Sequence, residues 1–164
     1  MRINDTLRDY LTIAACFFIA FILAVLPFPE WAERFRPDWV GLVLIYWCIA
    51  MPTKVTVGIG WVVGLILDVL FDSPLLGQLA LAYALLAFLS VKMHLRLRMY
   101  PRWQQAVVIL ILLVVIQFLT IWIRIMLSQP AKFTNFWISV LISMLIWPWT
   151  FALLRNVRRR MGIR

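Results

Sequence analysis

Apolar residues along this chain gather into six long runs, separated from one another by proline or by charged positions. The runs are residues Leu11–Leu26, Trp39–Met51, Val55–Phe71, Leu75–Val91, Gln104–Leu127 and Phe133–Leu154. Most have close to the roughly 17–25 residues that an α-helix needs to cross a bilayer core. The pattern predicts an all-α, polytopic membrane protein of about six transmembrane helices, which form a single integral membrane domain over residues 1–164.

The second run, Trp39–Met51, is short for a membrane span. Its 13 residues give a helix of roughly 20 Å, whereas the hydrocarbon core is about 30 Å thick. Three interpretations stay open for this run. The helix crosses a locally thin membrane, or it is extended by Phe35–Asp38, or it turns back with the third run as a re-entrant hairpin.

Composition indicates that lipid is the solvent for much of the chain. Hydrophobic residues make up 65% of the sequence and charged residues 14%, and the mean hydropathy is +0.95. A soluble domain averages about 45–50% apolar and about 25% charged residues. A soluble fold of 164 residues has too small an interior for so many apolar side chains.

The basic residues indicate which helix ends face the cytoplasm. The formal net charge is +9. With the N-terminus inside, the cytoplasmic stretches hold 12 basic residues: Arg2, Arg8, Lys54, Lys92, Arg96, Arg98, Arg102, Arg155, Arg158, Arg159, Arg160 and Arg164. The opposite side holds four: Arg34, Arg36, Arg124 and Lys132. Because cytoplasmic loops of membrane proteins collect Lys and Arg, both termini are predicted to be cytoplasmic, and no nucleic acid is needed to explain the charge.

Two of these stretches are strongly basic, the predicted loop Lys92–Arg102 and the tail Arg155–Arg164. Anionic lipids of the inner leaflet attract such segments, so we expect them to touch the lipid bilayer. An acidic protein surface is the alternative partner.

The sequence carries no motif of a common enzyme class. It has no Gly-rich phosphate loop, no HExxH and no serine-nucleophile motif. Cys16 and Cys48 lie singly inside apolar runs, and one histidine, His94, does not complete a metal site with them. We therefore expect no catalytic residue, no metal and no cofactor.

Asp68 is the most informative polar position. It follows Gly60 and Gly64 at intervals of four residues, which places all three on one face of the third helix. Small residues allow another helix to approach closely, and a carboxylate in a membrane helix is costly unless it has a partner. Two interpretations follow. Asp68 is a polar lock or a proton-linked site facing a neighbouring helix, or it is an interfacial carboxylate wetted together with Asp72.

Other candidate residues for a partner or helix interface lie on three segments. Arg124, near the end of the fifth run, is expected at the depth of Asp68, where it either pairs with that carboxylate or extends to the head groups. In Arg36-Pro37-Asp38 the proline suits a first helical turn and the aspartate a helix N-terminus, which leaves Arg36 for a partner or a lipid phosphate. Trp147-Pro148 predicts a kink in the last helix.

These elements together resemble the MreD family of small bacterial membrane proteins. The matching segments are Phe35–Trp39, Gly58-x-Gly60-x-x-x-Gly64-Leu65-x-x-Asp68, Leu76-Gly77, Trp103–Ala106, Phe136-Trp137 and Leu145–Trp149. Trp103–Ala106, Phe136-Trp137 and Leu145–Trp149 look like the proteobacterial members in particular, and the order and spacing of all the segments together make the resemblance specific. The match runs from about Leu26 to the C-terminus, and the first helix matches in hydropathy alone.

The resemblance implies that the chain is a non-catalytic component of the rod-shape and cell-wall elongation complex, and that it lies in the bacterial cytoplasmic (inner) membrane. It implies association with the single-pass protein MreC, and a place near RodA, a class B penicillin-binding protein and the actin-like MreB. The family fold is thought similar to substrate-binding membrane subunits of vitamin transporters, which supplies the alternative function. That alternative predicts converging polar groups at one level, for which the sequence offers Gln78, Tyr83 and Gln117.

Overall fold

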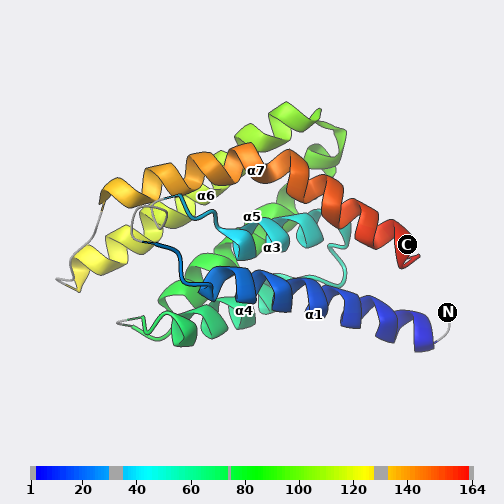
Figure 1. The fold of residues 1–164 in the computed structure, drawn as a ribbon, viewed down its shortest axis with the longest axis horizontal. Coiled ribbons are helices and arrows are strands. Elements are labelled where there is room, and N and C mark those ends of the chain that lie inside the picture. The colour runs from blue at the N-terminus through cyan, green and yellow to red at the C-terminus, as the bar shows by residue number, and fades with distance from the viewer. Residues whose placement is uncertain (1–2, 30–34, 74, 128–132, 163–164) are drawn as a thin grey trace.

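The computed structural model describes residues 3–29, 35–73, 75–127 and 133–162, and this part of the chain contains six α-helices and no strand (Figure 1). The helices are α1 (Ile3–Val25), α3 (Trp39–Ala50), α4 (Val57–Leu70), α5 (Gln78–Met99), α6 (Arg102–Met126) and α7 (Phe133–Arg160). Each corresponds to one of the six apolar runs. The prediction of an all-α polytopic protein is confirmed.

Helix length divides the bundle into two classes. α1, α5, α6 and α7 contain stretches long and apolar enough to cross a membrane, whereas α3 has 12 residues and α4 has 14. At about 1.5 Å per residue, α3 extends only about 18 Å. Every residue from Val40 to Ile49 is buried, because α1, α5 and α7 surround the helix. α3 is therefore the core of the bundle and is shielded from lipid by protein.

The two short helices do not pack chiefly against each other. α3 and α4 each pack along α5, and α3 also contacts α1 and α7. α5 thus lies between the two short helices and links them. The first turn of α3 begins at Trp39, so Phe35–Asp38 does not extend the helix either.

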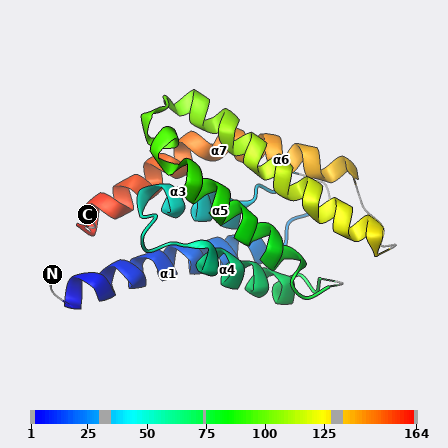
Figure 2. The ribbon, with the colours of Figure 1, turned by 180° about the vertical axis from the view of Figure 1, so that it is seen from behind.

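Both ends of the chain lie at one end of the bundle. Figures 1 and 2 show that α1 begins where α7 finishes. The α3–α4 connection reaches the same end, because Lys54 forms an ion pair with Asp9 of α1. This arrangement agrees with six crossings that alternate in direction. Four residues of the charge count, Arg2, Arg34, Lys132 and Arg164, lie outside the described residues.

The predicted basic loop Lys92–Arg102 is largely helical, which corrects the sequence interpretation. α5 continues to Met99 and α6 begins at Arg102, so the two helices are separated only by Tyr100 and Pro101. α7 likewise extends to Arg160. Lys and Arg are good helix formers, and their charge is favourable in the last turn of a helix. These residues therefore prolong the helices instead of ending them.

Candidate functional site

Four predicted residues meet in one cavity at the end of the bundle away from the chain ends. Arg36, Pro37, Asp38 and Arg124 line this cavity of about 210 Å³ together with Tyr83 of α5, Gln117 and Thr120 of α6, and Ser139 of α7. We call this the Asp38 pocket. Its polar groups come from four different segments, which is more convergence than the sequence suggested.

Asp38 is the centre of the hydrogen bonds around this pocket. It is the N-cap of α3, and its Oδ1 accepts hydrogen bonds from the Gly41 amide at 2.8 Å and the Tyr83 hydroxyl at 2.7 Å. Its own amide donates to Ser143 Oγ at 2.9 Å. A short side-chain acceptor at this position satisfies an amide that the helix itself leaves unpaired. Asp38 therefore joins α3 to both α5 and α7.

Pro37 does not lie in the first turn of α3, as the sequence interpretation placed it. It precedes the N-cap, and its carbonyl accepts a hydrogen bond from the Trp39 amide at 3.0 Å. The fixed φ of proline favours an extended entry into the helix just as well as a first turn. The tight turn across Asp38 is what directs the aspartate side chain back over the helix N-terminus.

Arg36 is held through both its backbone and its side chain. Its carbonyl accepts a hydrogen bond from Ser139 Oγ at 2.6 Å, and Ser143 Oγ donates to the Ser139 carbonyl at 2.8 Å. Its guanidinium lies over the rings of Phe28 and Phe71, at 5.8 and 5.7 Å from their centroids. These are cation–π distances, so Arg36 packs on aromatic rings of two other segments.

Asp38→Ala is expected to destabilise the bundle more than Tyr83→Phe. The alanine variant loses the α3 cap and leaves the Tyr83 hydroxyl without its acceptor, a total of about 1–3 kcal/mol. The phenylalanine variant loses one hydrogen bond, about 0.5–1.5 kcal/mol. Free energies of unfolding in detergent measure both, and the double variant should resemble Asp38→Ala alone. Equal losses for the two single variants would contradict the capping role.

Arg124 has no ion pair with Asp68 in the structure. Both residues are described, and no salt bridge joins them. Arg124 lines the Asp38 pocket, and its buried Nε has no hydrogen-bond partner within the described segments. A buried charged donor of this kind calls for an acceptor from outside the described chain.

Asp68 instead caps the N-terminus of α5. Its carboxylate accepts three backbone N–H bonds, from Gly77 at 2.9 Å, Leu79 at 3.0 Å and Ala80 at 3.0 Å. The side chain is 1% exposed, so it is not wetted together with exposed Asp72. The N-cap of α5 is Gly77, at φ +106°, which favours glycine and provides no capping side chain. Asp68 provides the missing acceptor from α4, against the positive end of the α5 dipole.

The glycines of α4 lie in direct contact with the backbone of α5. A Cβ on Gly60 would lie 2.6 Å from the Tyr83 carbonyl oxygen, and one on Gly64 would lie 2.5 Å from Ala80 Cα. No residue other than glycine fits so close a helix approach without movement. Because α5 covers this face, it is not available to a helix of another protein.

Trp147 and Pro148 belong to the interior of the bundle. Trp147 is fully buried and packs at 5.7 Å, ring centroid to ring centroid, from Phe151. α7 continues through Pro148 as one helix, and Figure 1 shows it changing direction near its middle. Proline lacks the N–H that the preceding turn requires, which is the usual cause of such a bend.

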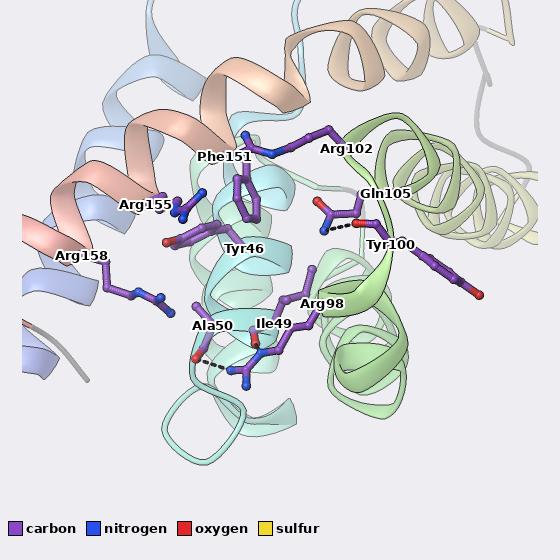
Figure 3. Close-up of a pocket in the computed structure, with 10 residues that line it drawn as sticks. All are labelled: Tyr46, Ile49, Ala50, Arg98, Tyr100, Arg102, Gln105, Phe151, Arg155 and Arg158. Atoms are coloured by element: carbon purple, nitrogen blue, oxygen red, sulfur yellow. Dashed lines mark hydrogen bonds between the residues drawn. The ribbon is translucent and has the colours of Figure 1, made fainter.

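A second cavity, at the end that carries the chain ends, was missed by sequence reasoning. It has a volume of about 600 Å³ and is lined by Tyr46, Ile49, Ala50, Arg98, Tyr100, Arg102, Gln105, Phe151, Arg155 and Arg158 (Figure 3). We call it the arginine pocket. The charge pattern predicts that these arginines share a side of the membrane. It does not predict the cluster, because the arginines come from helix ends more than fifty residues apart in the sequence.

Within the described residues, no group of three or more His, Cys, Asp or Glu side chains is placed to hold a metal ion. The polar contacts of the Asp38 pocket and of Asp68 connect helices to one another. These contacts fix the helix arrangement, and the half-buried Arg124, whose Nε is buried, lines the Asp38 pocket.

Comparison with known proteins agrees with this membrane architecture. The family model described as rod shape-determining protein MreD matches residues 5–157, and thus includes the first helix. The chain is similar to the rod shape-determining protein MreD of Haemophilus influenzae, with 32% identity over 155 residues, which cover 94% of this chain and 95% of that protein. No solved structure matches significantly. The chain belongs to the MreD family of rod shape-determining proteins.

Proposed function

We propose that the chain is a non-catalytic scaffold of the rod-shape and wall-elongation complex, holding partner membrane proteins for lateral peptidoglycan synthesis. The observation that carries this proposal is the family match over residues 5–157. In the proposal, residues 1–164 form one domain in the cytoplasmic (inner) membrane, with both chain ends in the cytoplasm. The partners are MreC, and in the same complex RodA, a class B penicillin-binding protein and MreB.

The Asp38 pocket is our candidate contact site for MreC. Its lining residues Asp38, Tyr83 and Ser139 are already engaged in hydrogen bonds within the chain, so they supply a rigid wall. Arg124 contributes the buried Nε that lacks an acceptor in the described chain. A carboxylate or a free backbone carbonyl of a partner segment would satisfy that donor. The glycine face of α4 is excluded from this role because α5 covers it.

One observation favours the alternative, a substrate-binding membrane subunit of a vitamin or small-molecule transporter. The Asp38 pocket brings polar side chains from several helices to one level, as such a site requires. However, its volume of about 210 Å³ is below the roughly 300–1,000 Å³ of usual ligand pockets. We therefore rank the transporter function second.

Depletion of the protein in its own rod-shaped host separates the two functions. For a scaffold, depleted cells become round and lose lateral wall incorporation, and re-expression of the protein restores both. Cells that stay rod-shaped but require a supplied vitamin would overturn the scaffold proposal in favour of the transporter.

Complementation of the depleted cells then tests Arg124. Arg124→Gln is expected to lower recovery of MreC with this protein roughly ten-fold or more, because a hydrogen bond to a charged group contributes about 1.5–3 kcal/mol. Arg96→Gln is the matched control, since it removes the same charge from an exposed site on α5. Equal MreC recovery with both variants, at equal protein levels, would remove the Asp38 pocket as the contact site.

A further inference from the structure

The arginine pocket concentrates positive charge without any acidic lining residue. Its four arginines come from the end of α5 (Arg98), the start of α6 (Arg102) and the end of α7 (Arg155 and Arg158). Figure 3 shows Arg155 and Arg158 on one side of the cavity, with Arg98 and Gln105 across from them. Like charges gathered around one cavity repel each other unless an anion lies between them.

Two of the arginines are fixed by contacts within the chain. Arg98 donates from Nε to the Ile49 carbonyl at 3.0 Å and from Nη2 to the Ala50 carbonyl at 2.8 Å, which holds it at the C-terminal end of α3. Arg102 lies over the ring of Phe151, 4.7 Å from its centroid. Each guanidinium keeps further N–H groups for a ligand, since arginine has five.

The other two arginines, Arg155 and Arg158, have no ion pair or hydrogen bond with any described residue. Arginine suits a phosphate because its planar group presents parallel N–H donors to two oxygens at once. Two fixed and two available guanidinium groups around about 600 Å³ therefore match a phosphate better than a single carboxylate.

Gln105 adds an independent sign of a ligand. Its side chain is 5% exposed, and its Nε2 donates to the carbonyls of Leu97 at 2.7 Å and Tyr100 at 3.2 Å. Its buried Oε1 has no hydrogen-bond partner in the described chain, and Figure 3 shows this oxygen directed into the pocket. An unpaired acceptor in the wall of the pocket would be satisfied by a donor on the ligand, such as a hydroxyl group.

The surroundings of the pocket favour a lipid as the source of the phosphate. Next to Arg102 and Arg98 along the chain lie Trp103 and Met99, which are 67% and 77% exposed. Exposed tryptophan is typical of the boundary between membrane and water, and exposed apolar side chains there contact acyl chains. A head group in the pocket would leave its acyl chains on this apolar surface.

We propose that the arginine pocket binds a phosphate ester that carries a hydroxyl group, supplied by the head group of an anionic phospholipid. Arg155 and Arg158 bind the phosphate oxygens, Arg98 and Arg102 complete the positive wall, and Gln105 Oε1 accepts a hydrogen bond from the hydroxyl. This site is independent of the proposed scaffold function, since it needs neither MreC nor the Asp38 pocket.

The test uses the full chain in a neutral detergent, with dioctanoyl phosphatidylglycerol as the lipid probe and native mass spectrometry as the readout. The double variant Arg155→Gln/Arg158→Gln is expected to weaken binding roughly ten-fold or more. Its matched control is Arg159→Gln/Arg160→Gln, which removes the same charge from the same helix at residues that do not line the pocket. Equal weakening by the two double variants would overturn the proposal in favour of diffuse surface attraction.

Two further arms examine the hydroxyl and the source of the phosphate. Dioctanoyl phosphatidylmethanol has the same charge and no hydroxyl, so the wild type should prefer phosphatidylglycerol several-fold and Gln105→Leu should lose that preference. A wild type without the preference would overturn the role of Gln105. Glycerol 3-phosphate tests a soluble source: binding as tight as that of the lipid, with the same arginine dependence, would support the phosphate site and overturn its assignment to a lipid.

Discussion

Gly64→Ala is expected to lower the free energy of unfolding in detergent by more than about 3 kcal/mol. The new Cβ would lie 2.5 Å from Ala80 Cα, 2.5 Å from the Leu79 carbonyl oxygen and 2.7 Å from the Ala80 amide nitrogen. All three are backbone atoms, so no side-chain rotation relieves the overlap and α4 must move away from α5. Overpacking of an interior costs about 1–3 kcal/mol even where side chains can adjust.

The displacement would also disturb a second set of contacts. Leu79 and Ala80, against which Gly64 packs, are two of the three residues whose amides bond to Asp68. Each buried hydrogen bond that is broken adds about 1–3 kcal/mol. The close approach of α4 to α5 and the capping of α5 by Asp68 therefore depend on the same backbone positions. A single added methyl group would disturb both.

Gly58→Ala is the matched control for this prediction. It lies on the same helix, and the nearest atom to its added Cβ is Thr56 Oγ1 at 3.8 Å, an ordinary contact. Alanine is a better helix former than glycine by about 0.5–1 kcal/mol, so this variant should be unchanged or slightly more stable. If the two alanine variants had the same stability, the close approach of α4 to α5 would be refuted.

The helices themselves were largely predictable from the sequence, because apolar runs bounded by proline and charge reflect the thickness of a bilayer. Their ends were less predictable. The run Trp39–Met51 looked too short to span, and no local signal showed that α1, α5 and α7 would surround it. The basic residues after Val91 looked like a loop, although helix propensity and the helix dipole both favour their place in the last turns of α5.

The candidate residues were easier to select than their partners. The spacing of Gly60, Gly64 and Asp68 indicated a shared face, since that depends only on helix geometry. Which helix would cover the face depends on the tertiary arrangement, so α5 was not identified. One feature of the sequence did point to α5. Gly77, at the start of α5, has no side chain to cap the helix, so the unpaired amides of its first turn need an acceptor from elsewhere.

The arginine pocket was even harder to predict, because it depends entirely on how the helices are arranged. Arg98 and Arg155 are separated by the last residue of α5, all of α6 and most of α7, and only the return of α7 along the bundle brings them together. The positive-inside rule predicted their side of the membrane and nothing about their clustering. The unpaired Oε1 of Gln105 is likewise visible only when the helices are placed.

Replacement of Asp68 is the second change with a large expected effect, and its size depends on the residue that replaces the aspartate. Asp68→Leu removes the acceptor of three amides at the start of α5, each of which costs about 1–3 kcal/mol when left unpaired in the interior. It also removes a negative charge from the positive end of the helix dipole. We expect this variant to be unfolded in detergent, and to fail to restore rod shape in depleted cells.

Asp68→Asn should lie between Asp68→Leu and the wild type. Oδ2 accepts from Gly77 and Ala80, whereas Oδ1 accepts from Leu79 alone. An asparagine with its carbonyl oxygen in the place of Oδ2 keeps two of the three bonds and turns its amide group toward the Leu79 amide. The expected loss is one hydrogen bond, about 1–3 kcal/mol, with rod shape largely retained.

Asp72→Asn controls for the loss of charge at this end of α4. Asp72 is exposed, and its φ of +45° is one that asparagine tolerates well, so no change in stability or cell shape is expected. The comparison of the two Asp68 variants then identifies what the carboxylate does. If the carboxylate acts through its hydrogen bonds to α5, stability should fall from the wild type to Asp68→Asn and further to Asp68→Leu. Equal loss in both variants at normal protein levels would mean that the negative charge itself is required, and that Asp68 serves charge or proton chemistry instead of the cap.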